Sequence, residues 1–382
     1  MGDQQLSPQQ VQRYGIIQRL ITRDITEKEA GELLNRSARQ VRRLKRKVMI
    51  GGPLALIHRN IQRTPWNRRD DKLTTRIVTL YETKYYGFNC LHFKDMLEDE
   101  GVRIGRESLR EIFITHGFPR RKKRVTRRYQ RRERKPQPGL LIQQDGSPHD
   151  WFGTGNPCTL IASIDDANNE VVFAKFFLQE GTLPHMEAIK TIVETKGVFV
   201  ALYVDRASCF KTIRHESIHV QLTGNYENTQ VQRALKEVGS TLIPALSAQA
   251  KGRVERLFET LQDRLVHELK LAGVTTIAAG NIFLASFLPR FNKRFMVTPA
   301  SNQTAYRPPT NHLNLALIFS VQGERVVRAD NTISFEGTWY QLQATKTRVS
   351  FAKAVVTVHQ CIDGRIRILY KGEEIPYTPS LW

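Results

Sequence analysis

The chain changes both its hydrophobic pattern and its charge near residue 140, and this change limits the folds open to it. Residues 1–140 hold 33 Lys and Arg against 15 Asp and Glu, whereas residues 141–382 hold 25 against 22, which together make the totals of 58 and 37. Apolar positions repeat at helical spacing in the first part and alternate between strand and helix patterns in the second. We therefore expect a multidomain protein, with a basic helical part followed by an α/β part.

The net charge of +21 is concentrated in the first part, which carries +18 of it. Charge gathered in one third of a chain indicates a surface for a polyanion, and nucleic acid is the polyanion that fits best. The chain has no apolar run of 18 residues, and its first ten residues, MGDQQLSPQQ, do not resemble a signal peptide. We therefore expect a soluble, cytoplasmic protein.

Residues 1–52 have the pattern of a helix-turn-helix domain. Helical spacing predicts helices over 9–23, 26–33 and 38–48, with Ser37 as the cap of the third. In that third helix apolar residues face inward, and the outward residues expected to contact DNA are Arg39, Arg42, Arg43 and Arg46. A trihelical bundle with a solvated basic face is the alternative.

Residues 65–118 repeat this arrangement. Leu73 to Tyr81 and Leu91 to Leu97 have helical spacing, and Arg106–His116 predicts a third helix with an apolar inner face. The residues left for phosphates or bases are Arg103, Arg106 and Arg110. Two such modules favour sequence-specific docking on DNA.

A basic linker over 119–139 follows the second module. Its stretch Arg120–Pro138 holds eleven basic residues and one Glu. A solvated connector is the simpler interpretation, but such density suits contact with a DNA backbone and would make affinity depend steeply on salt. The residues expected to contact phosphates are Arg121, Lys122, Lys123, Arg124, Arg127 and Arg128.

From residue 140 the pattern predicts an α/β core, residues 140–305, with a mixed five-stranded sheet, and then a small barrel-like β domain, residues 325–382. The core strands are expected at Leu140–Gln144, Thr159–Ile164, Val171–Leu178, Val198–Val204 and Thr241–Pro244, and the helices at His185–Lys196, Thr229–Val238 and Gln249–Lys270. The strands of the last domain are expected at Thr332–Phe335, Trp339–Leu342, Ala354–His359, Arg365–Tyr370 and Glu374–Tyr377.

Three acids of this core are candidates for catalysis. Asp145 and Asp205 each follow an apolar run, and Glu255 lies near the start of the long helix. Carboxylates on rigid elements that meet at one edge suit two divalent ions, which activate a nucleophile and stabilise the leaving oxygen in phosphodiester chemistry. Mg2+ prefers such oxygen ligands.

Each acid also has a structural interpretation. Asp145 suits a turn before Gly146, Asp205 a helix cap, and Glu255 a salt bridge with Lys251 or Arg256. Five further acids compete for the catalytic role: Asp150, Asp165, Asp166, Glu259 and Asp263. Asp165 and Asp166 are better suited to shaping the turn after the second strand.

The sequence resembles the DDE-type transposases and integrases of the retroviral-integrase superfamily, whose catalytic core has an RNase H-like fold. The likeness rests on QQDGSPHDW around Asp145, on YVD ending at Asp205 and on the pattern K-G-x-V-E-R from Lys251 to Arg256. It extends over residues 10–382. The two N-terminal modules and QQDGSPHDWF look most like transposases of ISNCY-type insertion sequences.

The resemblance implies catalytic and metal-binding roles for Asp145, Asp205 and Glu255, with two Mg2+ ions, or Mn2+, per site. It implies binding of terminal inverted repeats and target DNA, cleavage and strand transfer, at least a dimer on DNA, and a place in the bacterial cytoplasm with the nucleoid. His149, Lys251 and Arg256 are further candidates for contact with the scissile phosphate. Two other functions stay open: a catalytically silent DNA-binding regulator, and an RNase H-like nuclease directed by DNA structure.

Overall fold

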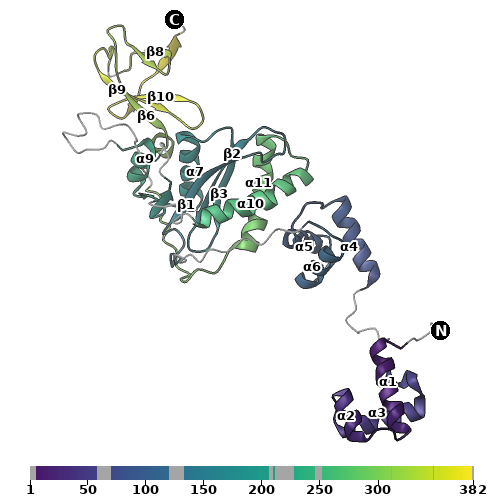
Figure 1. The fold of residues 1–382 in the computed structure, drawn as a ribbon. Coiled ribbons are helices and arrows are strands. Elements are labelled where there is room, and N and C mark those ends of the chain that lie inside the picture. The colour runs from purple at the N-terminus through teal and green to yellow at the C-terminus, as the bar shows by residue number, and fades with distance from the viewer. Residues whose placement is uncertain are drawn as a thin grey trace, which may run out of the picture. The chain divides into compact units, whose positions relative to one another are not determined.

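We describe the protein from a computed structural model. The residues that it describes are 6–57, 70–119, 133–205, 210, 228–245, 252–310, 312–346 and 348–380. The chain forms two compact units, Met1–Ile77 and Val78–Trp382, which we describe separately. Figure 1 shows purple helices at the N-terminal end, a central sheet flanked by helices, and a yellow region of strands towards the C-terminus.

The first unit is built on three capped helices. They are α1 (Pro8–Ile21), α2 (Glu27–Leu34) and α3 (Ala38–Gly51), followed by the short 3-10 helix η1 (Pro53–Leu56). Ser7, Thr26 and Ser37 each start a helix with a capping box, which satisfies backbone donors at the helix start. The core consists of Ile17, Leu20, Ala30, Val41, Val48 and Leu56. All three helices predicted from the spacing are present, with ends shifted by at most three residues.

The turn between α2 and α3 is tight. Asn35 ends α2 in the left-handed conformation, with φ of 51°, and the Arg36 N–H donates to the carbonyl of Gly31 at 2.8 Å. A Cβ atom at Gly31 would lie 2.8 Å from the carbonyl oxygen of Arg36. A glycine there therefore allows α3 to begin directly after the turn, behind its N-cap Ser37.

A second helical module consists of α4 (Asp71–Thr83), which crosses the boundary between the units, α5 (Cys90–Asp99) and α6 (Arg106–Thr115). Its core is aromatic: the ring of Tyr81 lies 5.1 Å from Phe93, 4.8 Å from Phe113 and 4.4 Å from Phe118, between centroids. Such ring contacts stabilise a small core beyond the area that they bury. The three helices predicted here are present.

The central sheet has five strands in the order β3-β2-β1-β4-β5. They are β1 (Ile142–His149), β2 (Cys158–Asp165), β3 (Val171–Phe177), β4 (Ala201–Val204) and β5 (Thr241–Pro244). β1, β2 and β3 form an antiparallel meander, and β4 runs parallel to β1 and to β5. The prediction of a mixed five-stranded sheet is confirmed.

Two apolar clusters place helices on both faces of this sheet. On one face α7 (Thr182–Thr195) and α9 (Gln230–Val238) pack through Ile189 and Leu235. On the other face α10 (Gly252–Leu271) and α11 (Ile277–Phe295) pack through Leu261 and Phe287. The core is thus a helix–sheet–helix sandwich, as Figure 1 shows.

Helix α11 was not predicted from the sequence. Its segment contains Pro289 in the helix interior. Its apolar residues also do not lie on one face: Phe287 and Phe291 are buried, whereas Ile282 is 76% exposed. Proline inside a helical pattern indicates a break. The apolar contacts with β3 and α10 hold the helix together regardless.

The C-terminal region follows the short helix α12 (Leu315–Ile318). One sheet has the order β11-β10-β9-β6 and the other the order β12-β8-β7. The strands are β6 (Val321–Val326), β7 (Thr332–Phe335), β8 (Thr338–Leu342), β9 (Val355–Gln360), β10 (Ile366–Tyr370), β11 (Glu373–Glu374) and β12 (Tyr377–Ser380). Both sheets contribute to one core, in which Val358 and Ile368 meet Ile333 and Leu342.

Two details of this region differ from the prediction. β6 was not expected, because its sequence VQGERV contains Gly323 and two charged residues. The expected strand Glu374–Tyr377 is two strands, β11 and β12, which are separated at Pro376. Proline has no N–H to donate, and its carbonyl accepts from the Gln343 N–H instead, at 2.8 Å.

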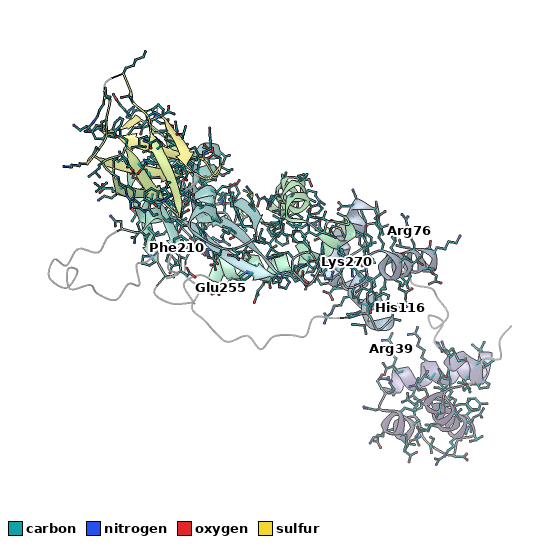
Figure 2. The ribbon with its side chains drawn as sticks, turned by 90° about the horizontal axis from the view of Figure 1, so that it is seen from above. Arg39, Arg76, His116, Phe210, Glu255 and Lys270 are labelled. Atoms are coloured by element: carbon teal, nitrogen blue, oxygen red, sulfur yellow. The ribbon has the colours of Figure 1, made fainter. Side chains whose placement is uncertain are left out.

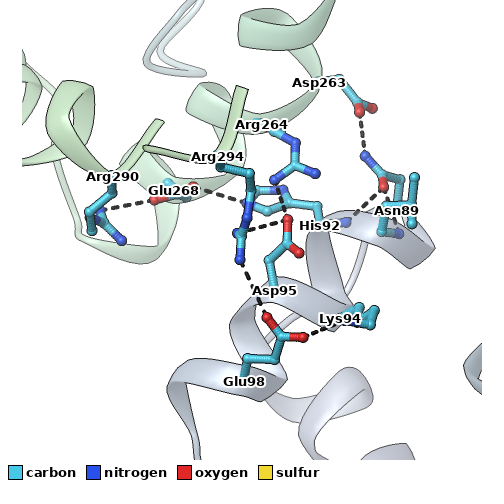
Figure 3. Close-up of polar contacts among 11 residues, drawn as sticks. Asn89, His92, Lys94, Asp95, Glu98, Asp263, Arg264, Glu268, Arg290 and Arg294 are labelled. Atoms are coloured by element: carbon cyan, nitrogen blue, oxygen red, sulfur yellow. Dashed lines mark hydrogen bonds and ion pairs between the residues drawn. The ribbon is translucent and has the colours of Figure 1, made fainter. Parts of the chain in front are cut away.

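Ion pairs fix the second helical module to the α/β core. The carboxylate of Asp95 on α5 accepts from Arg264 of α10 at 2.6 Å and pairs with Arg294 of α11 at 2.8 Å. The side chains of Asp95 and Arg264 are only 13% and 10% exposed. Figure 3 shows Asp95 between the two arginines.

The same interface holds a buried histidine. The Nε2 atom of His92 lies 3.0 Å from Glu268 of α10, and Glu268 pairs with Arg290 at 3.2 Å. The side chain of Asn89 donates to Asp263 (Figure 3). Removal of one partner from such a pair would leave the other charge buried without compensation. In the residues that the structure describes, no helix has the length and apolar character of a membrane span.

We expect Asp95→Ala to loosen this interface, since two arginines would lose their partner in a largely buried place. Removing one partner of a buried ion pair costs about 3–5 kcal/mol, so amide exchange in α5 should accelerate by roughly 100-fold or more. Hydrogen exchange followed by mass spectrometry measures this. Glu98→Ala is the matched control, because Glu98 is 41% exposed and meets Arg294 at 3.5 Å; there the expected cost is below about 1 kcal/mol. Equal exchange in both variants would contradict the prediction.

We also expect the C-terminal region to lose stability in mild acid. Burial lowers the pKa of His359, whose Nδ1 lies 2.9 Å from the hydroxyl of Ser320. Between about pH 6.5 and that lower pKa, the unfolded chain binds a proton that the folded chain does not, so stability falls as pH drops through this window. Thermal melts at about pH 7.5 and about pH 5.5 should show a larger decrease for the wild type than for His359→Gln. Parallel decreases would refute the assignment to this histidine.

Candidate active site and DNA-binding faces

The register of β1 and β4 places the two candidate aspartates at the same height. Their parallel pairing aligns Gln143 with Tyr203. Asp145 lies two residues beyond Gln143, and Asp205 lies two residues beyond Tyr203, so the same register sets them opposite one another. Neighbouring strands run about 4.8 Å apart, and both aspartates are half-buried. This is the distance scale at which two carboxylates can share metal ions.

Asp145 lies within its strand and not at a strand end or in a turn. β1 continues to His149 through antiparallel pairing with β2, and Asp145 faces Ala162 in that ladder. The prediction that the strand ends at Gln144 is therefore wrong, because hydrogen bonds to β2 extend it. The strand that ends at this level is β4, at Val204.

A buried polar cluster fixes the start of α10 over β1. Asp166, at the end of the β2 segment, accepts from the Gln143 side chain at 2.7 Å and from Arg253 at 2.8 Å. The Gln143 side-chain oxygen accepts from the backbone N–H of Val254 at 3.3 Å. Gln143 and Asp166 are fully buried. The residue before Glu255 is thus tied to the residue two positions before Asp145.

A second contact shows that α10 runs along β1 in the same direction. The Gln262 side chain donates to the Ser147 hydroxyl at 3.2 Å. From Val254 to Gln262 a helix rises about 12 Å, and from Gln143 to Ser147 a strand rises about 13 Å. The two lengths agree, so the first two turns of α10 lie alongside Asp145.

Two glutamates of those turns share one side of the helix with Gln262. Glu255 and Glu259 are four residues apart, and Gln262 follows three residues later, which puts all three in one row. Both glutamates are exposed, and Figure 2 shows Glu255 at the beginning of α10. The geometry therefore leaves both glutamates as candidates for the third acid. Measured along β1, Glu259 lies closer than Glu255 to the level of Asp145.

The donor set suits Mg2+ in its chemistry, since carboxylate oxygens are hard ligands. Within the part of the chain that the structure describes, no three His, Cys, Asp or Glu side chains are gathered as ligands of one ion. The register of β1 and β4 aligns Asp145 with Asp205. Glu255 is placed near them only by the course of the α10 backbone along β1.

The competing acids have structural partners. Asp150 accepts from the backbone N–H groups of Thr154 and Gly155 at 3.0 and 2.9 Å and so shapes a turn. Asp263 faces Asn89 of the second helical module. Neither belongs to the row of residues beside Asp145.

Asp165 shapes the turn after β2, as expected, whereas Asp166 instead accepts from Gln143 and Arg253. Burial raises the pKa of Asp165, which accepts from the N–H groups of Gly139 at 2.7 Å and Ala167 at 2.9 Å. The Tyr306 hydroxyl donates to it at 3.1 Å. These bonds close the turn after β2 and hold the segments before β1 and after α11.

Of the further candidates, His149 and Arg256 lie on different elements, at the end of β1 and on α10. His149 is half-buried at the end of β1, with its ring 5.3 Å from that of Trp151. Trp151 is fully buried, and its indole N–H donates to the Ser147 carbonyl at 3.1 Å, so it packs in the core. Arg256 is exposed and donates to the Gly252 carbonyl at 2.6 Å. Lys251 lies outside the described residues.

The arginines expected to contact DNA lie on the exposed faces of their helices. Arg39, Arg42, Arg43 and Arg46 are exposed on α3, opposite the buried Val41 and Val48. Figure 2 labels Arg39 on this helix. Arg42 also pairs with Glu27 at 3.2 Å, with both side chains exposed, a contact of little energetic weight.

In the second module Arg103, Arg106 and Arg110 are exposed. Arg110 and Arg106 approach Glu107 at 3.5 and 4.0 Å, which are weak surface contacts. The linker candidates Arg121, Lys122, Lys123, Arg124, Arg127 and Arg128 lie outside the described residues.

Sequence reasoning missed Gln143, Arg253 and the role of Asp166 in positioning the site. The signal was present in IQQD, where two amides stand in an otherwise apolar strand. Buried amides need partners, and here the partners come from α10 and from the turn after β2.

Comparison with known proteins gives two similar transposases over nearly the whole chain. The putative transposase y4bF of Sinorhizobium fredii is 33% identical over 384 residues, which cover 99% of this chain and 82% of that protein. The transposase for insertion sequence IS1202 of Streptococcus pneumoniae is 28% identical over 411 residues, covering 97% and 86%. No family model matches the chain.

Among solved structures, the simian T-cell lymphotropic virus intasome in complex with the PP2A regulatory subunit B56 gamma is similar with a TM-score of 0.34 and 11% identity. It covers 74% of this chain and 93% of that one. The HTLV-2 integrase catalytic core domain in complex with magnesium has a TM-score of 0.31 and 13% identity, and covers 43% and 92%. Both likenesses are weak, and the family assignment rests on the two transposases.

We expect Asp166→Ala to destabilise the core, because Arg253 is only 10% exposed and would keep its charge without this partner. The cost of about 3–5 kcal/mol corresponds to a decrease in melting temperature of roughly 6–20 °C for a domain of this size. Calorimetry measures it. Glu194→Ala serves as control, since Glu194 is 44% exposed in a helical pair with Lys190 and contributes below about 1 kcal/mol. A decrease no larger than that of the control would mean that the cluster does not fix α10.

Proposed function

This chain belongs to the transposase family represented by y4bF, and on that premise we propose that it cuts and joins DNA at the ends of an insertion sequence by a DDE mechanism. As a transposase it is a polynucleotidyl transferase. The proposal assigns Asp145, Asp205 and Glu255 as the catalytic acids and a pair of Mg2+ ions, or Mn2+, as the cofactor.

The observation that carries the proposal is the alignment of Asp145 with Asp205 across β1 and β4. Asp145 lies within β1 and Asp205 directly follows β4, so the sheet supports both backbones at neighbouring positions, as a preorganised site requires. The cluster of Gln143, Asp166 and Arg253 then supports the first turn of α10, where Glu255 lies.

Bound metal ions would activate the attacking oxygen and stabilise the leaving oxygen. The protein fold would hold Asp145, Asp205 and Glu255 in place as ligands and orient the scissile phosphate. In the proposed sequence, water cleaves at the end of the element and frees a 3′-hydroxyl, which then attacks target DNA in line. No covalent bond between protein and DNA is needed. One core supplies one site, so joining two ends requires at least a dimer on DNA.

The helical modules supply the DNA contacts in this proposal. The row Arg39, Arg42, Arg43 and Arg46 on α3 is assigned to the terminal inverted repeats, together with Arg103, Arg106 and Arg110 of the second module. The basic linker, with Arg121, Lys122, Lys123, Arg124, Arg127 and Arg128, is assigned to the phosphate backbone. Lys251 and Arg256 are assigned to the DNA beside the scissile bond.

A nicking assay tests the catalytic assignment. The substrate is a labelled duplex with the end of the element, incubated with Mg2+ or Ca2+. Asp145→Asn, Asp205→Asn and Glu255→Gln should each lower the rate in Mg2+ by more than about 100-fold, because even outer partners of metal ligands cost about 10- to 100-fold. Each variant should still shift the duplex in a gel. Glu194→Gln, an exposed change on α7, should leave the rate as it is.

Glu259→Gln decides the third acid in the same assay. A large loss in Glu259→Gln with activity kept in Glu255→Gln would move the role to Glu259. If the wild type shifts the end duplex and never nicks it, the chain is a DNA-binding regulator. Cutting of branched or hybrid substrates without preference for the element's end would indicate a structure-directed nuclease.

A further inference from the structure

A fourth carboxylate stands beside Asp145 on the other face of β1. The carboxyl group of Glu180 lies where a side chain at Gly146 would be: an added Cβ would meet it at 2.8 Å. Gly146 is not in a left-handed conformation, so backbone strain does not explain the glycine. The absence of a side chain instead makes room for this carboxylate one residue after Asp145.

A chain of hydrogen bonds from the sheet holds Glu180 in that position. The Ser163 hydroxyl donates to the Gln144 side-chain oxygen at 3.1 Å, and the Gln144 amide donates to Nδ1 of His185 at 2.8 Å. His185 Nε2 then lies 2.9 Å from Glu180. With Nδ1 as acceptor, the neutral ring carries its proton on Nε2 and donates it to the carboxylate. All three donors point the same way, and the chain ends at Glu180.

The inner members of this chain are buried, and its end is open. Gln144, Ser163 and His185 are fully buried, and Phe210 packs edge-on against the His185 ring at 4.6 Å. The Glu180 side chain is 35% exposed. A buried chain that presents one accessible carboxylate resembles the outer partners that orient ligands in metal sites. It is more than packing requires, since an apolar residue would fill the place of His185 without buried polar groups.

Both carboxylates border the same stretch of β1. Beyond the level of Asp205, β4 is no longer a strand, and no described strand continues on that side of β1. Asp145 lies on the α10 face of β1, as does Gln143. The carboxyl group of Glu180 lies on the α7 face, as does Gln144, and it is level with Gly146, one residue after Asp145.

We propose that Glu180 is a positioning residue of the active site, held by His185 against Gly146, and that its negative charge increases the affinity of the site for divalent cations. The inference rests on the proposed function, because it takes Asp145 as a metal ligand. Glu180 acts through the water shell of the bound ions and through Asp145, not as one of the three ligands.

Two variants test the proposal by different routes. Glu180→Gln removes the charge and keeps an oxygen that accepts from His185. Gly146→Ala keeps the charge and displaces the carboxyl group, which is the far end of a flexible side chain and so can move without disturbing the fold. Glu194→Gln, on the exposed side of α7, is the matched control for the loss of one negative charge.

The first measurement is the dependence of end-specific nicking on Mg2+ concentration. Both test variants should need about 10-fold more Mg2+ for the half-maximal rate, with the maximal rate within about threefold of the wild type, since no ligand or reacting group is removed. The second measurement needs no DNA and no activity: the Mn2+ concentration at which the melting temperature rises half-way should increase by about the same factor. The control should match the wild type in both.

The outcomes separate this inference from the proposed function. If the wild type nicks and Asp205→Asn does not, unchanged metal dependence in Glu180→Gln and Gly146→Ala overturns the role of Glu180 and leaves the transposase chemistry in place. A lower melting temperature without metal, combined with an unchanged Mn2+ midpoint, would mean that Glu180 is structural only, which also overturns it. If the wild type does not nick, the proposed chemistry fails, and the Mn2+ titration alone decides: equal curves for wild type and Glu180→Gln reject the inference.

Discussion

The architecture of the candidate site depends on one buried carboxylate, Asp166. It accepts hydrogen bonds from the Gln143 side chain, from Arg253 and from the backbone N–H of Lys135 at 2.9 Å. It thereby joins the central strand, the start of α10 and the segment that enters the core. A fully buried charge is tolerated only with several partners, and here those partners are the elements that must be in register for Asp145, Asp205 and the first turns of α10 to meet.

The sequence predicted what is decided locally and missed what is decided by distant contacts. Helices α1, α2 and α3 follow from their capping boxes and spacing, and β2, β3 and β5 follow from apolar runs. The extra length of β1 depends on its ladder with β2, and α11 depends on apolar contacts that compensate for Pro289. The order of strands and the parallel register of β1 with β4 are long-range features that spacing along the chain does not contain.

The same distinction applies to the site. The three acids were identified from their sequence context and family resemblance, which remain the reason to prefer Glu255 over Glu259. The structure adds the β1–β4 register, which aligns Asp145 with Asp205 when it is continued by two residues, and the direction of α10. Spacing along the chain could not identify Gln143, Arg253 or Glu180. Gln143 and Arg253 each contact a partner more than twenty residues away, and Glu180 lies where Gly146 makes room for it.

The second helical module is tied to the α/β core by side-chain contacts between distant parts of the sequence. From sequence it resembled an independent module, but its α5 is fixed to α10 by Asp95, His92 and Asn89. α10 also carries Glu255 and Glu259 on the row beside Asp145. One helix therefore meets the second module with one part of its surface and the candidate active site with another. Under the proposed function, docking at an element's end and alignment of the acids would therefore share α10 as one structural support.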